Sequence, residues 1–373
     1  MAGLVLLAAG GTGGHLFPAA ALAEVLRGRG HRIHLATDER VASYGRDFPA
    51  EAVHRIPSAT FAGGAVARAR AAARLGFGLI AAGALIVRLR PSVAVGFGGY
   101  PTLPPMMAAT LMRVPSVVHE ANAVLGRANR LLASRVTAVA ATTAAINVRD
   151  ADRGKVRLTG NPVRAVVRAL AGAAYRAPTG GERLRLLVFG GSQGARYLSD
   201  VVPAALEKLP ADFRNRISLT QQCRPEDLER VRAACARLSV PLEAEPFFQD
   251  LPARIAAAHL VVCRAGASTV TELAVIGRPA IMVPLPHALD QDQRENARIL
   301  ADAGGGWMFL EKDIDADRLA SELRLAMTDP GRLTAAAAAA LRIGRPDAVE
   351  RLADLVEDVA ARRGSPAQKD APA

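Results

Sequence analysis

The sequence predicts an α/β protein of two doubly wound, Rossmann-like domains that face a cleft. Its 373 residues are many for one core and suit two domains of ordinary size. Short apolar segments alternate with helical ones, which favours parallel sheets covered on both faces. A glycine-rich turn follows an apolar segment in each half, at 10–15 and at 190–196. Such turns bring backbone N–H groups close to an anion at a helix start, so two of them indicate transfer of a group between two bound ligands.

The first half begins with an apolar segment that leads into the first glycine turn and then a helix at 16–29. This start lacks the basic region of a signal peptide and is predicted to be a strand. Further apolar segments follow at the spacing of alternating strands and helices. The strand candidates are 3–9, 32–37, 92–95, 116–119, 136–140 and 156–158.

The second half restarts the alternation after a break at 160–164 and a Gly-, Ala- and Pro-rich segment at 171–182, where we expect the linker. The strand candidates are 184–189, 217–221, 242–245, 260–263, 280–284 and 307–309, with late helices at 333–341 and 347–363. We expect domains at 1–163 and 164–344, a C-terminal helix at about 345–363 that could pack back on the first domain, and a disordered tail at 364–373.

The net charge of +12 is concentrated in residues 52–119, which contain seven arginines and no acid. Within this stretch, 75–87 is uncharged but too short to span a bilayer, which takes about 20 residues. Arginines beside apolar residues fit an anionic membrane surface, and the alternative is a buried core helix. Nucleic acid is disfavoured because few aromatic residues lie between the basic ones. The arginines are Arg55, Arg68, Arg70, Arg74, Arg88, Arg90 and Arg113.

Three cysteines, Cys223, Cys235 and Cys263, have no CxxC spacing. We expect reduced structural thiols in a cytosolic protein. No group of residues has the spacing of metal ligands, so no metal or cofactor is expected.

His15 lies on the first glycine turn, where its imidazole could act as a base on a reacting hydroxyl. The turn lacks the G-x-G-x-x-G spacing of a dinucleotide site, although Asp38 ends the second strand candidate and keeps a dehydrogenase possible. His119 and Glu120 end another strand and could form a base with its orienting partner. Neighbouring strand residues point to opposite faces, so one of the two is expected to be structural.

The segment 263–272 ends a strand in Arg264 and opens a helix that carries Glu272. Backbone N–H groups with an arginine favour a diphosphate, and a carboxylate one turn on can accept two ribose hydroxyls. Glu272 could instead only complement the helix dipole. The segment 284–296 is rich in carboxamides and carboxylates, which suits sugar hydroxyls.

Seven ordered motifs carry a resemblance to a known family. They are GGTGGH at 10–15, FGGY at 97–100, HEAN at 119–122, GNPVR at 160–164, GGSQGAR at 190–196, RAGAST at 264–269 with Glu272, and DQDQ at 290–293 with Asn296. Over about residues 3–360 the chain resembles family 28 glycosyltransferases of the GT-B class. Enzymes of this kind add N-acetylglucosamine to undecaprenyl-pyrophosphoryl-muramoyl-pentapeptide in bacterial cell-wall synthesis. Ala121 and Gln291-Asp292 depart from the residues more common in that family.

The resemblance implies an inverting, metal-free transfer from UDP-GlcNAc (UDP-N-acetylglucosamine) to the 4-hydroxyl of the lipid-linked acceptor. The first domain would bind the acceptor and the membrane, and the second the donor. The expected catalytic residues are His15, His119 and Glu120, and the expected acceptor-pyrophosphate residues are Gly13, Gly14, Gly98, Gly99 and Tyr100. The implied UDP-GlcNAc set is Thr12, Gly13, Gly14, Asn122, Arg164, Ser192, Phe248, Arg264, Ala267, Ser268, Thr269, Glu272 and Gln293.

In that set Glu272 would bind the ribose, Arg264 and Ser192 the diphosphate, and the Phe248 backbone the uracil. The implied location is peripheral, on the cytoplasmic face of the bacterial inner membrane. Partners would include anionic inner-leaflet lipids and could include other cell-wall synthesis and division proteins, but no nucleic acid. Two alternatives stay open: another GT-B enzyme such as a UDP-GlcNAc 2-epimerase, and a non-catalytic basic membrane-binding protein. A soluble epimerase would not need the arginine-rich stretch.

Overall fold

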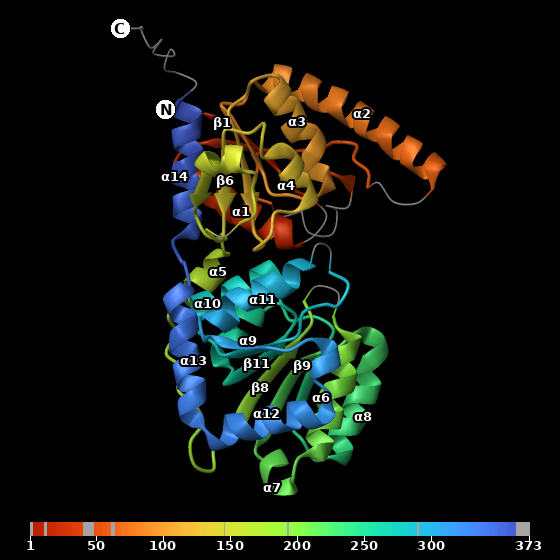
Figure 1. The fold of residues 1–373 in the computed structure, drawn as a ribbon, viewed down its shortest axis with the longest axis vertical. Coiled ribbons are helices and arrows are strands. Elements are labelled where there is room, and N and C mark those ends of the chain that lie inside the picture. Colours follow the sequence, from red (N-terminus) through yellow and green to blue (C-terminus); the bar gives the residue numbers. More distant parts are fainter. Residues whose placement is uncertain are drawn as a thin grey trace. The chain divides into compact units, whose positions relative to one another are not determined.

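The computed structural model describes residues 3–10, 13–39, 48–60, 64–144, 146–191, 194–288 and 291–362. The chain divides into two units, Met1–Arg164 with Asp347–Ala373, and Ala165–Pro346 (Figure 1). Each unit holds one sheet in which every described strand pair is parallel. The prediction of two parallel-sheet α/β domains is therefore confirmed. The predicted tail at 364–373 and the residues Thr12 and Ser192 lie outside the described residues.

The sheet of the first unit has seven strands in the order β3-β2-β1-β4-β5-β6-β7. The sequence did not predict β3, a short edge strand whose exposed and half-buried side chains alternate. The strands are β1 (Leu4–Ala8), β2 (Arg32–Thr37), β3 (Ala52–Arg55), β4 (Val93–Gly96), β5 (Ser116–Glu120), β6 (Ala138–Ala141) and β7 (Val156–Leu158).

Two cores cover the two faces of this sheet because successive strand residues point to opposite sides. Val5 and Leu7 pack with Leu22 and with Val356 of the last helix, whereas Leu6 packs with Ile86 on the other face. The helices of this unit are α1 (Gly13–Gly28), α2 (Ala65–Leu89), α3 (Leu103–Leu111), α4 (Arg127–Leu132) and α14 (Ala348–Ala361), with 3-10 turns η2 (Tyr100–Thr102) and η3 (Asp150–Lys155).

Helix α14 lies along α1 and is tied to its end by charged side chains. The guanidinium of Arg29 pairs with Asp354 at 2.6 Å and with Glu357 at 2.6 Å. The imidazole of His31 lies 2.9 Å from the other Glu357 oxygen. Burial raises the pKa of the Glu357 carboxyl, but the hydrogen bonds from His31 and Arg29 outweigh this effect, so the pKa is lowered. The C-terminal helix is thus part of the first unit, although it follows the whole second unit in the sequence.

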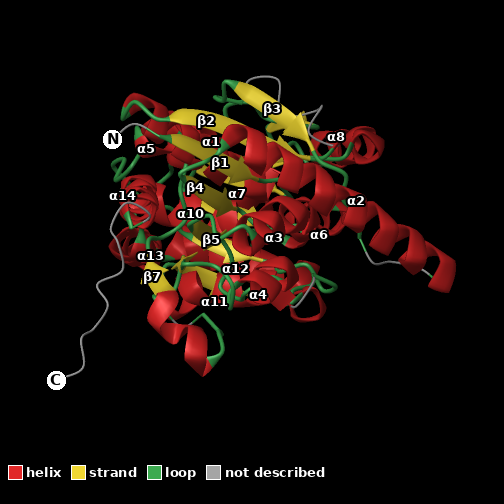
Figure 2. Ribbon diagram, turned by 90° about the horizontal axis from the view of Figure 1, so that it is seen from above, coloured by secondary structure: helices red, strands yellow, loops and turns green. Residues whose placement is uncertain are grey.

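Helix α2 is, among the described helices, the one long and apolar enough by length and composition to cross a membrane. One face packs into the unit through Gly78, Ala82 and Ile86, while Phe77 and Ile80 on another face are 70% and 71% exposed. Figures 1 and 2 show its amino-terminal end extending beyond the rest of its unit. The segment 75–87 is therefore core on one side and an exposed apolar surface on the other.

The second unit has six strands in the order β10-β9-β8-β11-β12-β13. They are β8 (Leu184–Phe189), β9 (Ile217–Gln222), β10 (Leu242–Glu245), β11 (Leu260–Cys263), β12 (Ala280–Met282) and β13 (Gly306–Met308). The helices are α5 (Ala165–Arg168), α6 (Arg196–Lys208), α7 (Ala211–Arg214), α8 (Leu228–Arg237), α9 (Leu251–Ala257), α10 (Ala267–Ile276), α11 (Asp292–Asp302), α12 (Ala316–Thr328) and α13 (Pro330–Ile343), with η4 (Pro225–Asp227) and η6 (Glu311–Asp313).

The segment 171–182, predicted as the linker, instead packs into the second unit. Arg278, only 2% exposed, donates hydrogen bonds to the carbonyl oxygens of Ala173 at 3.0 Å and Ala174 at 3.1 Å. The hydroxyl of Tyr175 donates to the His259 carbonyl oxygen at 2.8 Å. The prediction was wrong because composition does not reveal that a distant buried arginine satisfies this segment's carbonyls. The boundary between the units lies at Arg164 and Ala165.

Candidate functional site

In the first unit, the glycine turn after β4 lies against the imidazole of His15. Gly98 and Gly99 have φ of +86° and +77°, a region that favours glycine. A Cβ added to either residue would lie 3.3 Å from a carbon of the His15 ring. The turn is fixed because the Thr102 hydroxyl donates to the Gly98 carbonyl oxygen at 2.5 Å. The structure thus brings together the motifs at 10–15 and 97–100, with Tyr100 half-buried at the start of η2.

The imidazole of His15 is held in its neutral form near pH 7. Burial lowers its pKa, and the charge of Glu120 and the Phe97 carbonyl oppose this shift. Because the residue is still partly exposed, a ligand at the turn can reach it. Gly13 and Gly14, at the start of the same helix α1, are buried and exposed respectively. A neutral imidazole beside a carboxylate is suited to accept a proton, since the negative charge stabilises the imidazolium that forms.

Glu120 is 3% exposed, and its carboxylate accepts four hydrogen bonds from the chain that follows it. The donors are the Asn122 backbone N and side-chain Nδ2, both at 3.0 Å, the Gly126 N at 2.8 Å and the Asn129 Nδ2 at 2.9 Å. Burial of a carboxylate is tolerated when hydrogen bonds satisfy its oxygens. Glu120 therefore anchors the loop between β5 and α4, and it holds the side chain of Asn122 in place.

His119 is fully buried, and its Nε2 lies 3.2 Å from the Gly160 carbonyl oxygen. Burial lowers its pKa to about 4, so the ring is neutral near pH 7, and its Nε2 donates to that carbonyl. The ring centroid lies 5.5 Å from that of Phe97. His119 thus connects the end of β5 to the turn at Gly160. Of the three predicted catalytic side chains, His119 and Glu120 are buried, and His15 is the partly exposed one.

Arg164 closes the first unit, with its guanidinium 4.7 Å from the centre of the Phe17 ring on α1. Such a contact stabilises a cation over an aromatic face. It places the partly exposed guanidinium of the 160–164 motif beside the helix that follows the first glycine turn.

In the second unit, the turn after β8 is built on glycines at positions that disfavour other residues. A Cβ on Gly190 would lie 2.4 Å from the Ala195 backbone N. Gly191 and Gly194 have φ of +83° and +66°. The side chain of Gln222, at the end of β9, holds the turn: its Oε1 accepts from the Gly190 N at 3.1 Å. Sequence reasoning missed Gln222, which carries no motif of its own.

The sequence predicts that Arg264 binds the diphosphate, but its side chain is buried and bonded to other parts of the protein. It is 7% exposed, and its Nη1 donates to the carbonyl oxygens of Val283 at 3.1 Å and Pro284 at 3.3 Å. Its Nη2 forms an ion pair with Glu311. Arg264 therefore holds the loop after β12 in place. Glu311 was not predicted, because its pairing with Arg264 depends on two distant strand ends meeting.

Helix α10 begins directly after β11, with Ala267, Ser268 and Thr269 half-buried in its first turn and Glu272 only 7% exposed one turn further. The preceding turn is held by α11. Gln293 Oε1 accepts from the Ala265 N at 3.3 Å and from the Leu285 N at 3.1 Å. The structure thus brings the predicted Gln293 to the turn that opens α10.

The loop after β10 contains two phenylalanines with opposite environments. Phe248 is 6% exposed, and the Arg254 guanidinium covers its ring at 4.2 Å. Phe247, which the sequence analysis did not single out, is 59% exposed. An exposed aromatic ring at the carboxyl end of a parallel strand is available to stack on a ligand.

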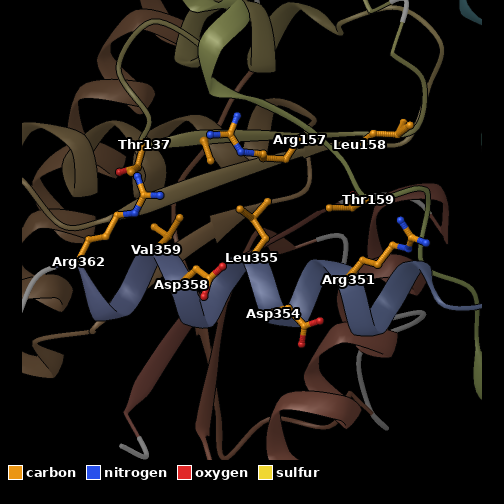
Figure 3. Close-up of a pocket in the computed structure, with 11 residues that line it drawn as sticks. Thr137, Arg157, Leu158, Thr159, Arg351, Asp354, Leu355, Asp358, Val359 and Arg362 are labelled. Carbon is orange, nitrogen blue, oxygen red and sulfur yellow. The ribbon is translucent and has the colours of Figure 1, made fainter.

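Each unit also has a pocket. In the second unit, a cavity of 490 Å³ lies between Tyr197, Leu285 and Lys312, beside Glu311. In the first unit, a cavity of 320 Å³ lies between β6, β7 and α14 (Figure 3). Residues of the segment 284–296, predicted to suit sugar hydroxyls, line the cavity of the second unit: Pro284, Leu285, Pro286, Gln291 and Arg294. None of the predicted site residues lines the cavity of the first unit. No group of three or more His, Cys, Asp or Glu in the described ranges could hold a metal ion.

Two parallel-sheet units, each with a glycine-rich segment that leads from a strand to a helix, are typical of two-domain α/β enzymes that use a nucleotide-linked substrate. Sequence models identify the particular family: the family 28 N-terminal domain matches residues 5–141, and the family 28 C-terminal domain matches residues 185–354. The chain belongs to glycosyltransferase family 28.

Several relatives resemble nearly the whole chain. A protein of Rhodopseudomonas palustris is 54% identical over 359 residues, or 96% of this chain and 98% of the relative. A protein of Rhizobium johnstonii is 51% identical over 362 residues, or 97% of this chain and 96% of the relative. Both are named UDP-N-acetylglucosamine–N-acetylmuramyl-(pentapeptide) pyrophosphoryl-undecaprenol N-acetylglucosamine transferase.

Solved structures agree with this family. The crystal structure of Acinetobacter baumannii MurG has a TM-score of 0.77 and 27% identity, covering 95% of this chain and 99% of that one. The kitacinnamycin glycosyltransferase, at 18% identity and a TM-score of 0.67 over 96% of this chain and 99% of that one, shows the shared fold alone.

Proposed function

We propose that this protein transfers N-acetylglucosamine from UDP-GlcNAc to the 4-hydroxyl of undecaprenyl-pyrophosphoryl-MurNAc-pentapeptide. The observation that carries this function is the 54% identity, over 96% of the chain, to a transferase named for that reaction. The test is UDP release from UDP-GlcNAc with and without the lipid-linked acceptor. Release that needs the acceptor supports the transferase, whereas conversion to UDP-N-acetylmannosamine without acceptor would identify an epimerase.

The reaction would be a single inverting displacement. As the acceptor 4-hydroxyl oxygen bonds to the anomeric carbon, the bond from that carbon to UDP breaks, and the hydroxyl proton passes to a base. His15 is our candidate for this base because the residue is partly exposed and its neutral imidazole is near the Glu120 charge. His119 and Glu120, both buried, would hold the loops around it. General-base catalysis of this kind contributes about 10²–10⁴-fold.

The acceptor pyrophosphate would bind the first unit at two adjacent turns. Gly13 and Gly14 open helix α1, whose N-terminus offers backbone N–H groups and partial positive charge. Gly98, Gly99 and Tyr100 form the turn beside His15. Backbone recognition fits these positions, since a side chain at Gly98 or Gly99 would contact the His15 ring.

The donor would bind the second unit through α10 and the loops around it. The N–H groups of Ala267, Ser268 and Thr269 would face the nucleotide, and Glu272 would accept the ribose hydroxyls. The backbone of Phe248 would bind the uracil edge. We assign Arg264 a supporting role instead of direct contact, because two carbonyls and Glu311 already occupy its guanidinium.

We further propose that the N-terminal and C-terminal domains divide the acceptor and donor roles, and that the protein binds the cytoplasmic face of the inner membrane peripherally. Helix α2 supports this location. Phe77, Ile80 and Val87 expose 60–71% of their surface, and Arg68 and Arg70 near its projecting end are exposed. Apolar side chains beside arginines bind anionic bilayers through both burial and charge.

A further inference from the structure

A single buried amide joins two ligand-facing loops of the second unit. Gln222 is 6% exposed, and its Nε2 donates to the carbonyl oxygens of Gly191 at 2.9 Å and Pro246 at 3.1 Å. Its Oε1 accepts from the Gly190 N at 3.1 Å. The amide oxygen and both amide protons of the side chain are therefore hydrogen-bonded to backbone groups of the turn after β8 and the loop after β10.

These two loops carry different parts of the proposed donor site. The glycine turn after β8 would bind the diphosphate through backbone N–H groups, and the loop after β10, which holds Phe247 and Phe248, would bind the uracil. We propose that Gln222 is a positioning residue that fixes the spacing between the diphosphate-binding turn and the uracil-binding loop. This inference rests on the proposed donor function and deepens it.

The three hydrogen bonds require the chemistry of an amide. A glutamate at this position would turn an acceptor oxygen toward the two carbonyls, and a hydrocarbon would leave three backbone groups without this partner. Burying a polar group without its hydrogen-bond partner is unfavourable, so the loops would move to satisfy these groups. In the proposed donor site a nucleoside diphosphate would contact both loops, whereas uridine would contact only the loop after β10. The loss should therefore be specific to ligands that contact both.

The neighbouring Gln221 provides a matched control. It is fully buried on the same strand, but its Nε2 donates to the Leu198 carbonyl oxygen at 3.4 Å. Successive residues of a strand point to opposite faces, so Gln221 reaches neither loop. Replacing either glutamine by methionine keeps the length of the side chain and removes a buried amide. Both variants should lose stability, but only the Gln222 variant should disturb the spacing between the two loops.

The experiment measures UDP and uridine as competitive inhibitors against UDP-GlcNAc for the wild type, Gln222→Met and Gln221→Met. For Gln222→Met we expect UDP affinity to fall about tenfold or more, uridine affinity to stay within about twofold, and KM for UDP-GlcNAc to rise. Gln221→Met should keep the wild-type ratio of UDP to uridine affinity. Gln222→Asn, whose side chain is one methylene shorter, should also lower the ratio of UDP to uridine affinity. It replaces Gln222→Met in the experiment if that variant does not fold.

The proposal is overturned if Gln222→Met keeps the UDP-to-uridine ratio of Gln221→Met, or if it weakens both ligands equally. A wild-type protein that binds neither UDP nor UDP-GlcNAc would refute the donor function itself. The two failures are therefore distinguishable.

Discussion

The assignment of His15 as the base makes a pH-dependent prediction. The base must be neutral, so kcat falls as pH drops through its pKa in the enzyme–substrate complex. Burial lowers the His15 pKa below 6.5, and the nearby Glu120 charge opposes this shift. The acid limb of the wild-type profile should therefore lie below pH 6.5. His15→Ala should lower kcat by about 10²–10⁴-fold, or about 3–5 kcal/mol of transition-state stabilisation, and abolish that limb.

Glu120→Gln tests the electrostatic part of this argument. Removing the carboxylate charge removes the larger of the two causes that raise the His15 pKa, so the acid limb should move to lower pH. The variant also weakens hydrogen bonds to the loop between β5 and α4, so its stability should drop. The assay is kcat at saturating substrates between pH 5 and 9, with UDP binding as the control for folding. An acid limb that persists in His15→Ala would refute His15 as the base, and a limb unmoved in Glu120→Gln would refute the coupling.

Three further variants test the donor site and the membrane surface. Glu272→Ala should raise KM for UDP-GlcNAc by about 10- to 100-fold, because two ribose hydroxyls lose a charged acceptor, and an unchanged KM would reduce Glu272 to a partner of the helix dipole. Phe247→Ala should weaken UDP binding by about 0.5–1.5 kcal/mol if its exposed ring stacks on uracil, with inhibition by UDP as the measurement and Phe247→Tyr as the control. Changing Arg68, Arg70 and Arg74 to Glu should release the protein from anionic vesicles at low salt while activity on a water-soluble acceptor persists, and continued sedimentation would exclude this helix as the docking surface.

The strands were largely predictable because parallel strands buried on both faces read as apolar runs. Strand β3 was missed because it does not form such an apolar run. Its His54 and Arg55 lie on a sheet edge, where half-exposed side chains interrupt the apolar pattern. Helix α2 illustrates a further limit, since its composition fits a core helix and a membrane surface equally. The structure distinguishes the two faces of the helix, because Gly78 and Ala82 are buried in the unit whereas Phe77 is exposed.

The site shows the same division between local and long-range information. Motifs placed His15, Glu272 and Gln293 at strand ends and helix starts, because glycine turns and helix caps are local signals. The pairing of Arg264 with Glu311 and the contact of Gln222 with Gly190 link residues far apart in sequence. No spacing rule predicts such pairs, since they exist only once neighbouring strands align their carboxyl ends.

Three buried polar side chains, Glu120, Arg264 and Gln222, share one physical role. Each forms hydrogen bonds with backbone groups of a loop that follows a strand: two backbone N–H groups for Glu120, two carbonyls for Arg264, and two carbonyls with one N–H for Gln222. Glycine turns offer ligands mainly backbone N–H groups, which bind a phosphate only if the turn is already in place. Gln222 holds the glycine turn after β8 in this way, and Glu120 and Arg264 hold the loops after β5 and β12. Their substitution should therefore act on ligand affinity through loop position, even where the side chain never touches the ligand.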